Sequence, residues 1–135
     1  MSREQSVLRL ADDFMQALED CNVDAVRGIY CEDARLWHNF DGKLQSVEDN
    51  IKTLKWLHSK LKKVEYQIVR RELLFDGFLQ EHVLRGVLDS GEAFAMPACA
   101  IIKVQGNKII SLDEYLDASH VKPVSYTHLT LPTTD

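Results

Sequence analysis

Three residues in this sequence have the types that acid–base chemistry needs: His38, His82 and Glu114. An imidazole has an ordinary pKa of about 6.5, so it works as a general base near neutral pH. A carboxylate within hydrogen-bond reach can orient such an imidazole, which then moves a proton on a bound substrate. We therefore predict that His38, His82 and Glu114 form a catalytic group, provided that the fold places them on one surface.

The first of these residues lies in a short predicted strand over residues 34–39. Side chains alternate between the two faces of a strand. One face carries Ala34, Leu36, His38 and Phe40. Arg35 on the other face prefers water, which predicts that His38 points inward. The alternative, in which Trp37 is the buried side chain, would turn His38 outward.

His82 and Glu114 lie in two later predicted strands. Glu81 and Arg85 favour the solvent face of the first of these strands, which predicts that His82 points inward. In the second strand, one row consists of Ile110, Leu112, Glu114 and Leu116. A carboxylate in an apolar row is costly to bury unless it is paired or protonated, so Glu114 is a candidate functional group.

Apolar side chains on the same predicted faces would form the wall of a pocket around these groups. One strand contributes a face with small alanines, which leaves room for a cavity. We expect the substrate-binding wall to consist of Leu36, Phe40, Leu84, Phe94, Met96, Ala98 and Leu112. No dense set of metal ligands occurs in the sequence, so we predict neither a metal nor a cofactor.

Periodicity and turn residues predict the elements that must position this pocket. Apolar residues at helical spacing predict a helix over residues 3–20, a short helix up to Tyr30, and a third helix that begins at Ser46. Turn residues then separate four long strands, over residues 64–75, 78–88, 92–104 and 108–117. Pro97 inside the third of these indicates a bulge or an edge position.

This order of elements, with helices first and strands last, predicts an α+β fold. We expect a cone-shaped α+β barrel, in which a curved, mainly antiparallel sheet clasps the N-terminal helices. The length of 135 residues fits a single domain, which we place at residues 1–122. Residues 123–135 continue no earlier pattern, and 125–135 resemble translated sequencing adapter, so we exclude them from functional reasoning.

The overall composition excludes some classes of function. With 16 basic and 21 acidic residues, the formal net charge is −5, which argues against a general nucleic-acid binder. No apolar run is long enough to span a membrane, and no signal peptide is seen. The three cysteines form no CxxC motif and fit buried thiols in a reducing compartment. We therefore expect a cytoplasmic protein.

Three local stretches resemble a known superfamily. They are residues 30–39 (YCEDARLWHN), 80–86 (QEHVLRG) and 106–117 (GNKIISLDEYLD). The first and third, with the order of helices and strands, resemble the nuclear transport factor 2-like superfamily, in its SnoaL-like and ketosteroid-isomerase-like branch. The third stretch is similar to that family's GKI…YxD ending, and the second to its middle strand. The resemblance covers residues 5–120 and implies the cone-shaped fold.

The resemblance also implies roles for single positions. His38 falls where ketosteroid isomerases place their catalytic aspartate, and His82 where epoxide hydrolases place a catalytic arginine. Glu114 matches the acid of those hydrolases that deprotonates water. Leu84 stands where they need a proton-donating aspartate, and Leu36 where they hold water with a tyrosine. Because of these departures, the resemblance argues against epoxide hydrolysis.

Two functions remain open from the sequence. The first is a small-molecule acid–base enzyme of the isomerase, cyclase or dehydratase type, which acts on a hydrophobic substrate in an internal pocket. The second is a non-catalytic ligand-binding or association module of the same fold. In either case the apolar side chains Leu79, Val83 and Val87 on the outer face of the sheet have to be shielded from water. We therefore expect a homodimer in which a second copy buries them.

Overall fold

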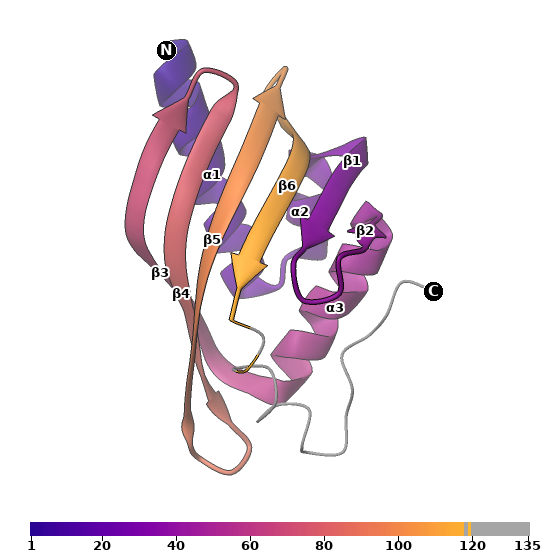
Figure 1. Ribbon diagram of the computed structural model, residues 1–135, viewed down its shortest axis with the longest axis vertical. Coiled ribbons are helices and arrows are strands. Elements are labelled where there is room, and N and C mark those ends of the chain that lie inside the picture. The colour runs from indigo at the N-terminus through magenta and orange to yellow at the C-terminus, as the bar shows by residue number, and fades with distance from the viewer. Residues whose placement is uncertain (118, 120–135) are drawn as a thin grey trace.

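The computed structural model describes residues 1–117 and 119 as three helices and six strands (Figure 1). In chain order the elements are α1 (Arg3–Asp20), α2 (Val23–Ile29), β1 (Tyr30–His38), β2 (Leu44–Gln45), α3 (Val47–Lys60), β3 (Leu61–Leu74), β4 (Gly77–Leu88), β5 (Ala93–Gln105) and β6 (Lys108–Leu116). The predicted tail, residues 123–135, lies outside the described residues. No helix in the described part of the chain is long and apolar enough to cross a membrane.

Side chains at the helix ends explain where the first two helices begin and stop. The Ser2 hydroxyl accepts a hydrogen bond from the Gln5 amide at 3.1 Å, and the Gln5 side chain accepts one from the Ser2 amide at 2.9 Å. This reciprocal capping box starts α1. Cys21, with a φ of 51°, ends it in the left-handed conformation, and Asn22 caps α2 by accepting from the Ala25 amide. These two helices lie where the sequence predicted them.

The six strands form one open, mixed sheet in the order β2-β1-β6-β5-β4-β3. The predicted antiparallel meander of four long strands is confirmed by the pairings β3–β4, β4–β5 and β5–β6. The first strand pairs parallel with β6 and begins at Tyr30 rather than at residue 34. The two-residue strand β2 was not predicted. The predicted α+β fold is confirmed, with a curved sheet that does not close into a complete barrel.

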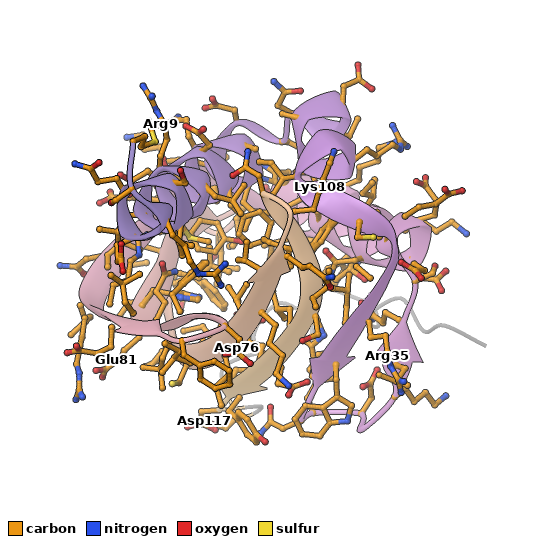
Figure 2. All side chains as sticks on the ribbon, turned by 90° about the horizontal axis from the view of Figure 1, so that it is seen from above. Arg9, Arg35, Asp76, Glu81, Lys108 and Asp117 are labelled. Carbon is orange, nitrogen blue, oxygen red and sulfur yellow. The ribbon has the colours of Figure 1, made fainter. Side chains whose placement is uncertain are left out.

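The helices lie on the concave side of the sheet, as the view from above shows (Figure 2). The labelled Arg35 and Glu81 project from the opposite, convex side. The main core fills the space between these layers, and it includes Phe14 of α1, Ile51 of α3 and Ile102 of β5, all at most 2% exposed. A long strand has to bend to wrap such a core, and this bend creates the hollow described below.

Two irregularities interrupt the regular pairing of the strands. Pro97 pairs with Val83 of β4, but pairing of β5 with β6 begins only at Ala98. The proline therefore occupies an edge position, as one of the two sequence interpretations had it. A register shift between β5 and β6 turns Ile109 inward, where it is fully buried, and leaves Ile110 half-buried. The prediction of Ile110 in the inner row was wrong, because one extra residue at a bulge reverses the faces.

Candidate active site

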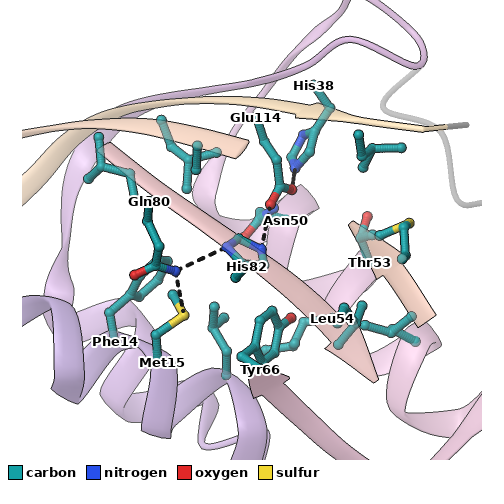
Figure 3. Close-up of a pocket in the computed structure, with 18 of the residues that line it drawn as sticks. Phe14, Met15, His38, Asn50, Thr53, Leu54, Tyr66, Gln80, His82 and Glu114 are labelled. Atoms are coloured by element: carbon teal, nitrogen blue, oxygen red, sulfur yellow. Dashed lines mark hydrogen bonds and ion pairs between the residues drawn. The ribbon is translucent and has the colours of Figure 1, made fainter. Parts of the chain in front are cut away.

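A cavity of about 130 Å³ lies between the concave face of the sheet and helices α1 and α3. Its wall is mostly apolar and rich in aromatic rings, among them Phe14, Trp56, Tyr66 and Phe94. His38, His82 and Glu114 also line it, and they lie close together on one side (Figure 3). Polar groups that converge in an apolar hollow are typical of a ligand site.

The pairing of the strands explains why these three side chains meet. His38 of β1 and Glu114 of β6 are partners in adjacent parallel strands. His82 of β4 is one strand further away, beyond β5. At this point β5 carries only Ala98 and Ala100 on the inner face. Because these methyl groups are small, the Glu114 carboxylate can pass over β5 to His82.

Glu114 bridges the two histidines through its two oxygen atoms. Oε1 of Glu114 lies 3.1 Å from Nε2 of His38, and Oε2 lies 3.3 Å from Nε2 of His82. The exposed fractions of the side chains are 10% for His38, 3% for His82 and 19% for Glu114. Both contacts are therefore shielded from bulk water, which strengthens them.

The charge of Glu114 is stabilised by its partners. Burial by itself raises the pKa of Glu114, but hydrogen bonds from His38 and His82, together with their charge, outweigh it. The net effect lowers the pKa of this carboxyl from 4.5 to about 2. Glu114 is therefore an anion at neutral pH, and it accepts hydrogen bonds rather than donating them.

A second layer of polar side chains supports His82. Nε2 of Gln80 lies 3.0 Å from Nδ1 of His82, and it lies 3.1 Å from the sulfur of Met15. Arg71 of β3 donates to Oε1 of Gln80 through Nε at 3.0 Å and Nη2 at 2.7 Å. At its outer end Arg71 contacts Asp12 of α1 at 2.7 Å. A continuous polar chain thus runs from the surface to the cavity.

Two tyrosines also contribute to the polar part of the cavity wall. The Tyr66 ring contacts the His82 ring edge-on, with centroids 5.5 Å apart. The Tyr30 hydroxyl donates to Oδ1 of Asn50 at 3.2 Å. Burial, and secondarily the negative charge of Glu114, raise the pKa of both Tyr30 and Tyr66. Both hydroxyls therefore stay protonated and are unsuited to act as bases near neutral pH.

Two buried nitrogen atoms in this wall have no hydrogen-bond partner among the described residues. They are Nδ1 of His38 and Nε1 of Trp56. A buried polar atom without a partner costs free energy, on the order of 1–3 kcal/mol. An unpaired buried atom of this kind needs an explanation, and a catalytic role or a bound water is one that applies to a cavity wall.

The structure places most of the predicted site residues in the cavity wall and two of them outside it. The three predicted catalytic side chains come together. Of the predicted substrate-binding residues, those that line the cavity are Phe40, Leu84, Phe94, Met96 and Leu112. Leu36 and Ala98 are buried, but they are not part of the cavity wall. Leu36 packs in the main core instead.

Several residues of the site were not singled out from the sequence. Gln80 is fully buried two residues before His82, so the period-two alternation puts it on the inner face, and a buried amide in that row was a detectable signal. Arg71 gave no such signal. Register shifts interrupt the pairing of β3 with β4 on either side of the Glu65–Ile68 segment, which obscures the alternation along β3. Across residues 1–117 and 119, no group of three or more His, Cys, Asp or Glu side chains is arranged to hold a metal ion.

Comparison with solved structures identifies the fold. A hypothetical protein with a ketosteroid isomerase-like fold from Catenulispora acidiphila DSM 44928, in complex with trimethylamine, matches with a TM-score of 0.74 and 19% identity over 93% of this chain and 97% of that chain. PrhC from Penicillium brasilianum matches with a TM-score of 0.82 and 10% identity over 93% and 89%. A putative SnoaL-like polyketide cyclase from Shewanella denitrificans OS-217 matches with a TM-score of 0.72 and 14% identity over 90% and 97%.

These matches show that the chain has the nuclear transport factor 2-like fold, of the ketosteroid-isomerase-like and SnoaL-like kind. The fold that the sequence resemblance implied is thereby confirmed. No protein-family model matches the sequence, and no curated protein matches it. Because one fold hosts many activities, the function has to be argued from the site.

Proposed function

We propose that this chain is a small-molecule acid–base enzyme, of the isomerase, cyclase or dehydratase type. The observation that carries the proposal is the bridge that Glu114 makes between His38 and His82 in the wall of an apolar cavity. A carboxylate that holds one nitrogen of an imidazole leaves the other nitrogen free for proton transfer, which is the arrangement of a general base.

In this proposal His38 is the base. Its Nε2 donates to Glu114, so its Nδ1 is the nitrogen that receives a proton. The substrate loses a proton from a carbon next to a carbonyl group, and His38 becomes an imidazolium beside the Glu114 carboxylate. Returning that proton to another carbon completes an isomerisation, and giving it to a departing hydroxyl group completes a dehydration. The neighbouring anion stabilises the imidazolium in both cases.

The cavity suggests the size and polarity of the substrate. An engineered protein cavity of about 150 Å³ holds one benzene molecule, so a cavity of about 130 Å³ suits a single ring or a chain of similar size. Its apolar wall, including Leu84 and Met96, favours a hydrophobic ligand. We therefore propose a small hydrophobic carbonyl compound as the substrate, converted without a metal or another cofactor.

The experiment that tests this proposal is a turnover screen of the purified protein with small hydrophobic ketones, lactones and epoxides. For any substrate found, His38→Ala should lower kcat by a factor of about 10²–10⁴, the usual contribution of a general base. The control is His58→Gln, since His58 binds the Leu18 carbonyl and is not in the cavity wall. Equal turnover by wild type and His38→Ala would remove His38 from the mechanism.

A second candidate function is a non-catalytic ligand-binding module. The observation that favours it is Leu84, which lines the cavity where related hydrolases need an acid. In that case the cavity binds a small apolar ligand and releases it unchanged. Calorimetric binding of a ligand that the protein never converts, with equal affinity in wild type and His38→Ala, would support this module over the enzyme.

We also propose that two copies associate through the convex face of the sheet. Leu79, Val83 and Val87 on that face are only half-buried in the single chain, and a second copy would cover them. The three cysteines are free thiols, which fits our proposal of a cytoplasmic, reducing location.

A further inference from the structure

We propose that Arg71 is a positioning residue that, through Gln80, holds His82 as a neutral imidazole with its proton on Nε2. His38 is then the one imidazole of the site that takes up a proton. The catalytic meaning of this assignment rests on the proposed function, whereas the proton position on His82 is independent of it.

Arg71 fixes the orientation of the Gln80 amide. The oxygen and nitrogen of a glutamine amide are told apart by their partners. Arg71 has only donors, and both Nε and Nη2 of its guanidinium contact the same Gln80 atom, at 3.0 and 2.7 Å. That atom must be the carbonyl oxygen. The amide nitrogen of Gln80 therefore points the other way, toward His82.

The orientation of the Gln80 amide in turn fixes the position of the proton on His82. The amide nitrogen of Gln80 can only donate, and it lies 3.0 Å from Nδ1 of His82. Nδ1 must therefore be the unprotonated, accepting nitrogen. The proton of the neutral ring then sits on Nε2, which donates to Oε2 of Glu114 at 3.3 Å. The dashed contacts in Figure 3 follow this order from Gln80 through His82 to Glu114.

The same contact opposes a second proton on His82. Protonating Nδ1 would set its N–H against the N–H of Gln80, and the His82 side chain is only 3% exposed, so water cannot relieve the conflict. Glu114 alone would favour a positive His82. The Tyr66 ring that packs on His82 is uncharged, and the charge of Arg71 behind Gln80 is balanced by Asp12. The amide of Gln80 thus decides the outcome.

His38 is not restricted in this way. Its Nε2 donates to the same carboxylate, while its Nδ1 has no partner among the described residues. A proton arriving at Nδ1 of His38 meets no opposing donor there. Before that proton arrives, the three groups carry the single negative charge of Glu114. This charge repels anionic ligands, so the site selects a neutral acid whose proton His38 can take.

The test is nitrogen NMR of the histidine rings in ¹⁵N-labelled protein over a pH series. In the wild type we expect an unprotonated Nδ1 and a protonated Nε2 on His82 at and above neutral pH. In Gln80→Glu, one carboxylate oxygen can pair with Arg71 while the other faces Nδ1 of His82. That variant should shift His82 to the doubly protonated form near neutral pH.

Two further variants separate positioning from general effects. Arg71→Met frees the Gln80 amide to turn over, so His82 should show a mixture of tautomers. Arg70→Met is the matched control, because Arg70 is the neighbouring arginine on β3, its side chain is 63% exposed, and it pairs with Glu72 on the surface. It should leave the His82 signals unchanged. If Arg71→Met does not fold, the wild-type and Gln80→Glu spectra still decide the question.

A proton on Nδ1 of His82 in the wild type at or above neutral pH would overturn the inference, as would a Gln80→Glu spectrum identical to that of the wild type. Turnover measurements distinguish a failure of this inference from a failure of the proposed function. If the tautomer is as stated but no substrate is converted, only the proposed function fails. With a substrate in hand, Gln80→Glu should lower kcat about tenfold or more with little change in KM, because a positive His82 competes for Glu114 and makes His38 a weaker base.

Discussion

Glu114 and His82 touch across an entire intervening strand, at 3.3 Å between Oε2 and Nε2. The strand between them, β5, has alanine on its inner face at both positions they cross. Neighbouring strands are about 4.8 Å apart, so strands two places apart are separated by about 10 Å. A long carboxylate side chain and an imidazole can close that gap only when nothing larger than a methyl group stands between them.

We predict that Ala100→Leu breaks this contact. Ala100 is 1% exposed and lines the cavity, so the added carbons occupy the space that Glu114 uses. Overpacking of a filled core costs about 1–3 kcal/mol of the free energy of unfolding. Urea denaturation measures the stability, and the His82 ring signals report the lost hydrogen bond. Ala100→Gly leaves the space open and should keep the contact, so loss of the contact in both variants would contradict the explanation.

A second prediction concerns stability at low pH. The pKa of Glu114 is lowered from 4.5 to about 2 in the folded protein, against the opposing effect of burial. The ionised carboxylate therefore stabilises the fold fully above pH 4.5, and this contribution is lost as the pH falls toward 2. Such a shift corresponds to a few kcal/mol, on the order of 3.

The measurement for this prediction is the free energy of unfolding by urea at several pH values between 2 and 6. Glu114→Gln should lack the part of the pH dependence that Glu114 causes, so the difference between wild type and variant should shrink as the medium becomes more acidic. Glu32→Gln is a suitable control, because Glu32 is an exposed residue of β1 that does not line the cavity. Parallel curves for wild type and Glu114→Gln would refute the assigned pKa direction.

A third prediction concerns the role of Glu114 in the proposed reaction. With any substrate that the protein converts, Glu114→Gln should lower kcat more than it changes KM. The reason is that the amide cannot balance the imidazolium that forms on His38 when the proton moves. Steady-state kinetics provide the test. A rise in KM alone would indicate that Glu114 contributes to substrate binding rather than to proton transfer.

The convex face of the sheet leads to a fourth prediction. If two copies associate through this face, Val83→Glu should convert a dimer into a monomer, because it places a charge in the apolar centre of the interface. Sedimentation velocity over a range of concentrations measures this directly. Glu4→Gln changes an exposed residue of α1, on the other side of the sheet, and should leave the association unchanged. A wild-type protein that stays monomeric at high concentration would exclude this dimer.

The sequence by itself determined the local elements and most side-chain directions. Capping residues such as Ser2 and Asn22 mark helix starts where apolar residues at helical spacing follow them, and the two-residue alternation around His38 and His82 follows from strand geometry alone. The alternation predicted the wrong face for Ile110, because a bulge there depends on how β6 pairs with its neighbours on both sides.

Only the tertiary structure decided which polar groups meet. The parallel pairing of β1 with β6 brings His38 to Glu114, although the two residues are 76 positions apart in the sequence. Likewise, the order Arg71–Gln80–His82 depends on the pairing of β3 with β4. Local patterns specify the face on which a side chain lies, whereas the neighbour it contacts there is set by the register between strands distant in sequence.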